Sequence, residues 1–234
     1  YHRPYDTYFS LPPYAPVSEL QEKYGSPNPK GLMEYISTCK REFKPQTKFQ
    51  YSCLNYITLQ HIIETITGQS LRDFAKENIF DILGMQYTDY LPTIQQQDGK
   101  WINTVACPWM DRIAPTEKQK DGSVLCGQVH DPLARILNGG ISGNAGIFSN
   151  ANDIGILAAA LLNGGEYNGH RILSPLGVKT MCTVPRELTA FGRTPGWDIF
   201  SPYASNKGDL FSPNTFGHTG YTGTSIIIDP DNDT

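Results

Sequence analysis

Residues 54–68 read LNYITLQHIIETITG, and this stretch decides the first half of the fold. Its apolar side chains recur every three or four positions, which is the spacing of one face of an α-helix: Leu59, Ile62, Ile63 and Ile66. Gly68 follows at once, and glycine commonly ends a helix. The pattern therefore predicts a helix over residues 54–67 that buries these four side chains in the core.

Helices are also predicted on both sides of this stretch. Ser70 and Ser174 each stand directly before a helical segment, where a serine side chain can cap the first turn. Pro175 adds a second signal, because proline is favoured at the first helical position. The predicted helices occupy residues 18–24, 31–43, 71–80, 131–137, 152–162 and 175–182.

The last third of the chain changes to strand character, with strands predicted over residues 197–200, 215–218 and 224–228. Residues 86–129 show little periodicity. Helices followed by strands predict the α+β class, with helices packed on an antiparallel sheet. Because no partner strand follows residue 228 in this sequence, we expect one partial domain over residues 1–234, incomplete at both ends.

Composition excludes several classes of function. Nineteen basic residues against 23 acidic ones give a net charge of −4, so no basic surface for a nucleic acid is expected. No apolar run approaches the roughly 20 residues that span a bilayer. The five cysteines are scattered and the five histidines show no metal-ligand spacing, so neither a disulfide framework, a metal site nor a cofactor is expected. We expect the cysteines to be buried as small apolar side chains.

Tyr51 stands directly before the strongest predicted helix. The positive end of a helix dipole favours a phenolate, and a cationic neighbour would bring the hydroxyl toward the range of a general base. The alternative interpretation is a packing aromatic side chain whose hydroxyl has a hydrogen-bond partner.

A second candidate segment is His218-Thr219-Gly220-Tyr221, which lies among Gly217, Gly220 and Gly223. Glycines weaken a strand, but they allow a substrate to approach the bare backbone. Free N–H groups on such a strand can bind a developing oxyanion. The alternative interpretation is a tight hairpin with a solvated histidine.

Two further features are given structural interpretations. The glycine-rich residues 139–146 lack the Gly-Lys-Ser/Thr of a phosphate loop. His130 and Asp131 are predicted to mark the entry of a helix, since adjacent residues do not readily face one another. An unrelated hydrolase that uses this pair with a serine is disfavoured because no Gly-x-Ser-x-Gly motif occurs.

Taken in order, these segments resemble the serine β-lactamase-related family, which includes class C β-lactamases, penicillin-binding D-alanyl-D-alanine peptidases and similar serine esterases. Tyr51-Ser52 is similar to the family's Tyr-x-Asn motif, and His218-Thr219-Gly220 to the His form of its Lys-Thr-Gly motif. Residues 143–149 also look like the family. The resemblance implies a β-lactamase/transpeptidase-like fold and a serine hydrolase that forms an acyl-enzyme on an ester, amide or peptide.

The resemblance also implies roles for particular residues. Tyr51 would move protons, and His218 would orient it at the same site although 167 positions separate them. The residues implied in substrate binding are Asn55, Thr219, Gly220 and Tyr221, and a backbone N–H near Gly220-Tyr221 would supply half of the oxyanion hole.

The relatives suggest a small-molecule or peptidoglycan-like substrate and a periplasmic or cell-envelope location. Because histidine carries less fixed charge than lysine at neutral pH, esterase or D-Ala peptidase-like activity is favoured over true β-lactamase activity.

The sequence departs from the family pattern at two places. Cys53 stands where many members have Asn or Asp. The family's Ser-x-x-Lys motif should lie well before Tyr51, and Ser37-Thr38-Cys39-Lys40 matches it only 14 residues earlier. We therefore expect the nucleophile upstream of Tyr1 and expect residues 1–234 alone to be inactive. The alternative is a non-catalytic binding or regulatory member of the same fold.

Overall fold

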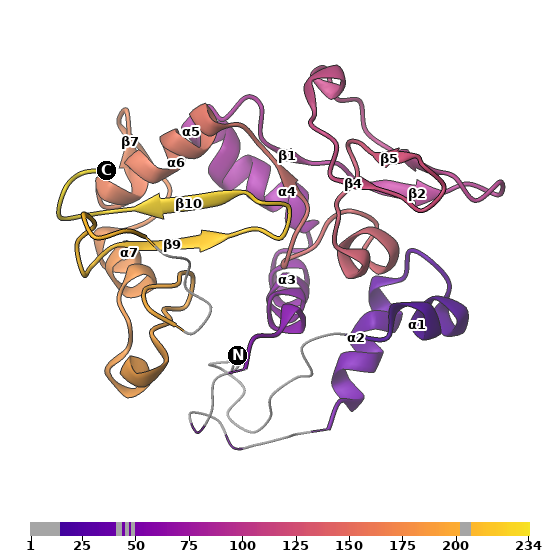
Figure 1. Ribbon diagram of the computed structural model, residues 1–234, viewed down its shortest axis with the longest axis horizontal. Helices are drawn as coiled ribbons and strands as arrows, with labels where there is room; N and C mark the ends of the chain where they lie inside the picture. The colour runs from indigo at the N-terminus through magenta and orange to yellow at the C-terminus, as the bar shows by residue number, and fades with distance from the viewer. Residues whose placement is uncertain (1–14, 41–43, 45–46, 48–49, 202–206) are drawn as a thin grey trace. The chain divides into compact units, whose positions relative to one another are not determined.

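The computed structural model describes residues 15–40, 44, 47, 50–201 and 207–234, apart from the side chain of Glu187 (Figure 1). These residues belong to two compact units. Unit 1 falls within residues 1–77 and 87–149, and unit 2 comprises residues 78–86 and 150–234. The predicted single domain over residues 1–234 stays a prediction.

Unit 1 is built around four helices: α1 (Val17–Tyr24), α2 (Pro29–Thr38), α3 (Cys53–Thr67) and α4 (Leu71–Ala75). A π-helical segment, η3 (Leu133–Leu137), packs against α1. The apolar side chains of these elements form one core that includes Leu20, Leu32, Ile36, Leu54, Ile57, Leu133 and Leu137. The predicted helices are confirmed, except that α2 ends at Thr38; residues 41–43 of the predicted helix lie outside the described residues.

The buried face of α3 differs from the predicted one. Ile66 is 78% exposed and Ile62 is also exposed, while Leu59 and Ile63 are half-buried. The core-facing positions are instead Cys53, Leu54, Ile57 and Gln60, which recur at the same helical spacing. The prediction was wrong because two stripes on this helix satisfy the same period, and packing against α2 and the core of unit 1 selects the other one.

Residues 86–149 form short antiparallel strand pairs where the sequence shows little periodicity. The pairs are β1 (Asp89–Tyr90) with β6 (Ile147–Phe148), β2 (Thr93–Gln95) with β3 (Trp101–Asn103), and β4 (Glu117–Lys118) with β5 (Val124–Leu125). A 3₁₀ turn, η2 (Met110–Arg112), lies between β3 and β4. Strands of two or three residues are too short to give an alternating pattern.

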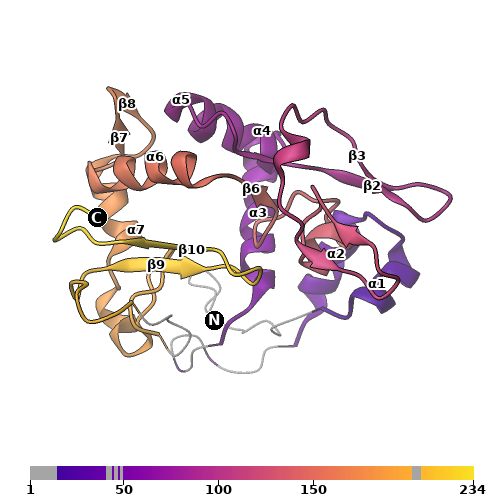
Figure 2. The ribbon, with the colours of Figure 1, turned by 45° about the horizontal axis from the view of Figure 1, so that its top comes forward.

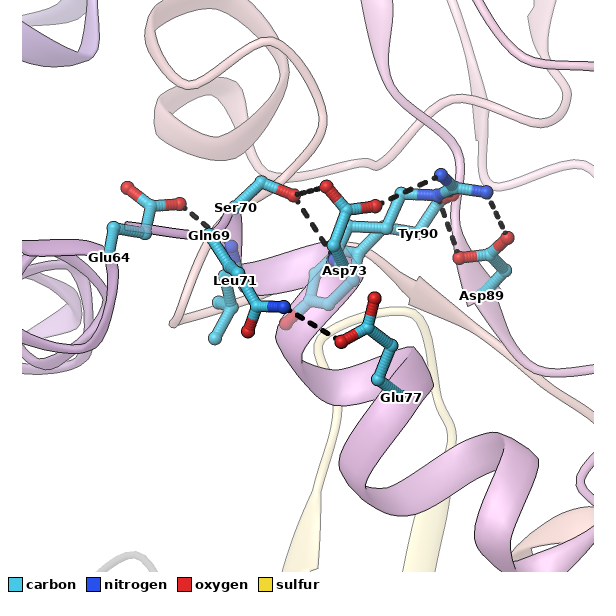
Figure 3. Close-up of polar contacts among 9 residues, drawn as sticks. Glu64, Gln69, Ser70, Leu71, Asp73, Glu77, Asp89 and Tyr90 are labelled. Atoms are coloured by element: carbon cyan, nitrogen blue, oxygen red, sulfur yellow. Dashed lines mark hydrogen bonds and ion pairs between the residues drawn. The ribbon is translucent and has the colours of Figure 1, made fainter. Parts of the chain in front are cut away.

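Side-chain hydrogen bonds join α3, α4 and β1 within unit 1 (Figure 3). The Leu71 N–H donates to Glu64 Oε1 over 2.9 Å, and Ser70 Oγ accepts from the Asp73 N–H as predicted for a cap. Arg72 binds Asp89 with two bonds, Nε to Oδ1 at 2.9 Å and Nη2 to Oδ2 at 2.6 Å. This forked ion pair ties the start of α4 to β1.

Unit 2 packs helices on an antiparallel hairpin (Figures 1 and 2). The hairpin is β9 (Phe216–Thr219) with β10 (Ser225–Ile228), and the larger helices are α6 (Ala151–Leu162) and α7 (Pro175–Cys182). Their shared core contains Leu161, Val178, Phe216 and Ile228. The predicted fold class, helices packed on an antiparallel sheet, is therefore confirmed.

The remaining elements of unit 2 are short. They are α5 (Asp81–Leu83), the strand pair β7 (Glu166–Tyr167) and β8 (His170–Arg171), and the 3₁₀ helix η4 (Arg186–Phe191). The π-helical η1 (Lys76–Phe80) continues α4 and leads from unit 1 into unit 2. The predicted strand over residues 197–200 is wrong. Asp198 forms isolated bridges to Arg193 and to Gly217 of β9, and the chain bends directly after it, where the N–H groups of Ile199 and Phe200 both donate to the Gly192 carbonyl.

Candidate functional site

Tyr51 lies at the mouth of α3, as the sequence predicted. Ser52 is the N-cap residue, with an extended backbone at φ −151° and ψ 122°. Tyr51 is half-buried and packs against the apolar core of unit 1. The ring is therefore held by packing while the backbone turns from extended to helical beside it.

The side chains next to Tyr51 form a hydrogen-bonded series within unit 1. The side chains of Tyr51 and Asn144 adjoin the Cys53 thiol, and while burial raises the pKa of that thiol, both side chains lower it. Ser142 Oγ donates to Asn144 Oδ1 over 2.7 Å, and Asn138 Nδ2 donates to Ser142 Oγ over 2.8 Å. Cys53, at the family's Asn position, thus links Tyr51 to the glycine-rich turn.

The glycine-rich turn of residues 139–146 is a packing device against α3. A Cβ on Gly143 would lie 2.0 Å from the Tyr56 carbonyl oxygen, so only glycine lets the two backbones approach this closely. The Gly143 N–H donates to Gln60 Oε1 over 3.0 Å, and Gln60 Nε2 donates to the Ile141 carbonyl over 3.1 Å. This packing explains Gly143 without any phosphate ligand.

Burial raises the pKa of the Cys53 thiol and raises the pKa of Cys182 to about 11. The prediction that the five cysteines are buried is confirmed for Cys53 and wrong for Cys126, which is exposed. The other three, Cys39, Cys107 and Cys182, are half-buried. Because the thiolate is the reactive form, we expect iodoacetamide at pH 8 to alkylate Cys53 and Cys182 at least about tenfold more slowly than Cys126.

Mass spectrometry of the alkylated peptides of the whole protein over time measures these rates. Denatured protein is the control, because unfolding removes the burial and brings the rates together. Equal rates for Cys182 and Cys126 in the folded protein would contradict the assignment.

Asn55 lies on the buried face of α3 and is 1% exposed. Its predicted contact with substrate stays a prediction. The structure brings Asn144 and Cys53 beside Tyr51, two residues to which the sequence reasoning assigned no site role. The sequence could not have identified these two residues, because the order of the motifs along the chain does not show which side chains are in contact.

His218 stands on β9, opposite Ile226 of β10. Its Nδ1 lies 2.8 Å from the Thr219 carbonyl oxygen, and its Nε2 lies 3.0 Å from Nη1 of Arg193. Both ring nitrogens therefore have partners within unit 2. The solvated histidine of the alternative interpretation does not describe this half-buried ring.

Arg193 and Asp198 form a buried ion pair that sequence reasoning missed. Nη2 of Arg193 lies 3.0 Å from Oδ2 of Asp198, and each side chain is 7% exposed. Asp198 also exchanges two backbone hydrogen bonds with Gly217. Arg193 and Asp198 stand on either side of a Thr-Pro-Gly-Trp sequence. A Pro-Gly pair is typical of a turn, and a turn there could have predicted that the two charged side chains lie close together.

Successive residues of β9 direct their N–H and carbonyl groups to opposite edges of the strand. Gly217 pairs with Asp198 on the edge away from β10, so the N–H and carbonyl of Thr219 face that same edge. The Gly220 N–H donates to the Thr224 carbonyl over 2.7 Å, so it does not serve as the predicted oxyanion donor. Tyr221, whose side chain is 90% exposed, is the other residue of that prediction.

Residues 7–234 match the family model described as Beta-lactamase. The chain belongs to the beta-lactamase family. The predicted membership is thus confirmed. A beta-lactamase family protein of Escherichia coli strain K12, provisionally named a D-alanyl-D-alanine carboxypeptidase, is 36% identical over 214 residues, covering 86% of this chain and 46% of that protein. The chain spans about half the length of the curated relatives it matches.

Two solved structures share the fold of this beta-lactamase family chain. A provisionally assigned beta-lactamase from Bacteroides dorei DSM 17855 has a TM-score of 0.58 at 17% identity, over 95% of this chain and 58% of that one. EstCE1, described as a hydrolase with promiscuous acyltransferase activity, has a TM-score of 0.57 at 19% identity, over 95% and 60%. At these identities the likeness shows the fold alone.

Ser37 and Lys40 do not form the helical pair that the beta-lactamase family's Ser-x-x-Lys motif requires. The α2 helix ends at Thr38, so Lys40 lies beyond the turn that carries Ser37. Ser37 Oγ donates to the Glu34 carbonyl over 2.7 Å. Neither residue has the geometry of an activated nucleophile with its base.

Asp131, the second residue of the His130-Asp131 pair, has a structural role. Asp131 Oδ1 accepts from the Ala134 N–H over 2.9 Å, which confirms the predicted helix entry. Within the described ranges, no three His, Cys, Asp or Glu side chains gather where a metal ion could bind. None of the helices over those ranges is both long and apolar enough to cross a bilayer.

Proposed function

We propose that the whole protein is a serine hydrolase that acts by acyl transfer on an ester, amide or peptide substrate. The observation that carries this proposal is the family's second and third motifs in their expected local settings. Tyr51 precedes the cap of α3, and His218-Thr219-Gly220 runs along β9 and out of it. Family membership supports the assignment.

The proposed reaction has two steps. A serine hydroxyl attacks the substrate carbonyl, its proton passes through Tyr51 to the leaving group, and an acyl-enzyme forms. Water then attacks the acyl-enzyme, gives up its proton through the same tyrosine, and releases the acid while the serine regains its proton. Thr219, the last residue of β9, and the N–H of Tyr221, in the turn after β9, are the groups assigned to the substrate and its oxyanion. In this proposal His218 acts in the same reaction as Tyr51.

The proposed substrates are small esters or D-Ala peptides like those of peptidoglycan. The name of the Escherichia coli relative supports the peptide substrate. Histidine in place of lysine at position 218 supports esters or amides without a carboxylate at that end over D-Ala peptides, which end in a carboxylate, and it disfavours true β-lactamase activity. A periplasmic or cell-envelope location would place the enzyme beside such substrates.

A fluorophosphonate probe tests the proposal. We expect it to label the whole protein on a serine upstream of Tyr1 and to leave a chain of residues 1–234 unlabelled. Mass spectrometry of the modified peptide identifies the serine. A label on Ser37 would overturn the predicted location of the nucleophile. A whole protein that the probe does not label, and that has no esterase activity, would favour the non-catalytic binding member instead.

A further inference from the structure

The guanidinium of Arg193 lies between two fixed partners within unit 2. Arg193 is 6% exposed, with Nη1 3.0 Å from His218 Nε2 and Nη2 3.0 Å from Asp198 Oδ2. Asp198 is itself held, because it accepts from the Ser201 N–H at 3.0 Å and from the Ser201 hydroxyl at 2.6 Å. The position of Arg193 is therefore set by a buried carboxylate and not by His218 alone.

The partners of His218 assign its tautomer. A guanidinium can only donate hydrogen bonds, so His218 Nε2 must accept from Arg193. A carbonyl oxygen can only accept, so His218 Nδ1 must carry the proton that it shares with Thr219. A ring with one donor and one acceptor nitrogen is the neutral imidazole, protonated at Nδ1.

We propose that Arg193 is a positioning residue for the acyl-transfer reaction, which holds His218 on β9 as the neutral, Nδ1-protonated imidazole. The inference rests on the proposed function for its kinetic part only. Its structural part follows from the contacts of His218 with Arg193 and Thr219 and of Arg193 with Asp198, whatever the reaction is.

The pairing also determines where positive charge lies beside β9. A proton on His218 Nε2 would face a guanidinium donor at 3.0 Å, which would break the hydrogen bond and oppose like charges. The other charged groups in this cluster are Asp198, which balances Arg193, and Lys207, whose ammonium donates to the Ile199 and Thr215 carbonyls. The histidine of the third motif thus offers no free cation, which favours substrates that lack a carboxylate at this end.

The first test reads the tautomer without any enzyme assay. The whole protein is labelled with ¹⁵N-histidine, and His218→Gln assigns the resonances of His218. We expect a protonated Nδ1 and an unprotonated Nε2 at neutral pH. Removal of the charged pair together, Arg193→Met with Asp198→Asn, leaves neither charge of this ion pair without the other and should return His218 to a mixture of tautomers.

The second test compares ester hydrolysis by the same variants. The double variant is expected to lower kcat by about tenfold to 100-fold with a KM change of less than about threefold, because a misplaced group affects the reacting geometry more than binding. The single variant Arg193→Lys should have a kcat between those of the double variant and the wild type. Lysine keeps a charged donor, but it lacks the two-pronged guanidinium that binds His218 and Asp198 together. Arg171→Met is the matched control: Arg171 donates to the Gly164 and Leu173 carbonyls and is expected to leave kcat unchanged.

Each outcome decides the proposal. An Nε2-protonated or doubly protonated His218 in the wild type would overturn it, and so would a tautomer or a kcat that the double variant leaves unchanged. A wild type without hydrolytic activity that still shows the Arg193-dependent tautomer would overturn the proposed function, while the structural assignment would be supported.

Discussion

The Tyr51→Phe variant of the whole protein is expected to hydrolyse a chromogenic ester at least about tenfold more slowly than the wild type. Groups that transfer protons in a transition state contribute about 100-fold to 10,000-fold in rate. Removing such a group from the reaction is therefore expected to slow it by at least about tenfold. The phenylalanine ring keeps the packing of Tyr51 against the core of unit 1. The substitution therefore removes the hydroxyl beside Cys53 and keeps the ring.

Tyr35→Phe is the control for this experiment. Tyr35 is also partly buried against the core of unit 1, and burial raises its pKa to about 12, so its hydroxyl stays protonated at neutral pH. We expect the control to keep the wild-type kcat/KM. An unchanged rate for Tyr51→Phe would remove Tyr51 from the mechanism, and equal losses in both variants would point to packing.

The Gly143→Ala variant is expected to lose about 3 kcal/mol or more of stability. The added Cβ would lie 2.0 Å from the Tyr56 carbonyl oxygen and 2.7 Å from its carbon, and both atoms belong to the backbone of α3. Overpacking costs about 1–3 kcal/mol even where side chains can move, and here a backbone must shift. The Gly143 N–H would also be pushed away from Gln60 Oε1.

Chemical denaturation of the whole protein measures this loss, and Gly155→Ala is the matched control. Gly155 lies in α6, where an added Cβ would meet no atom within 4 Å. Alanine in a helix is about 0.5–1 kcal/mol better than glycine, so the control should be as stable as the wild type or more so. A Gly143→Ala protein with wild-type stability would contradict the close packing of the turn on α3.

The sequence was sufficient for the end of α3 and the start of α7 because short-range contacts decide these boundaries. Gly68 ends α3 in the left-handed conformation at φ 70°, and Ser174 accepts the Gly177 N–H at the start of α7. Each contact joins residues at most four apart in the chain, so a local pattern contains all the information. The order of the motifs was likewise enough to predict the family.

By itself, then, the sequence determined the helices, the β9–β10 hairpin and the membership of the beta-lactamase family. Only the tertiary structure decided which stripe of α3 is buried, that Cys53 meets Asn144, and that Arg193 binds His218 across 25 residues. The physical reason is that a helical period allows more than one buried face, and a hydrogen bond between distant residues depends on how the chain folds back. A linear pattern carries neither kind of information.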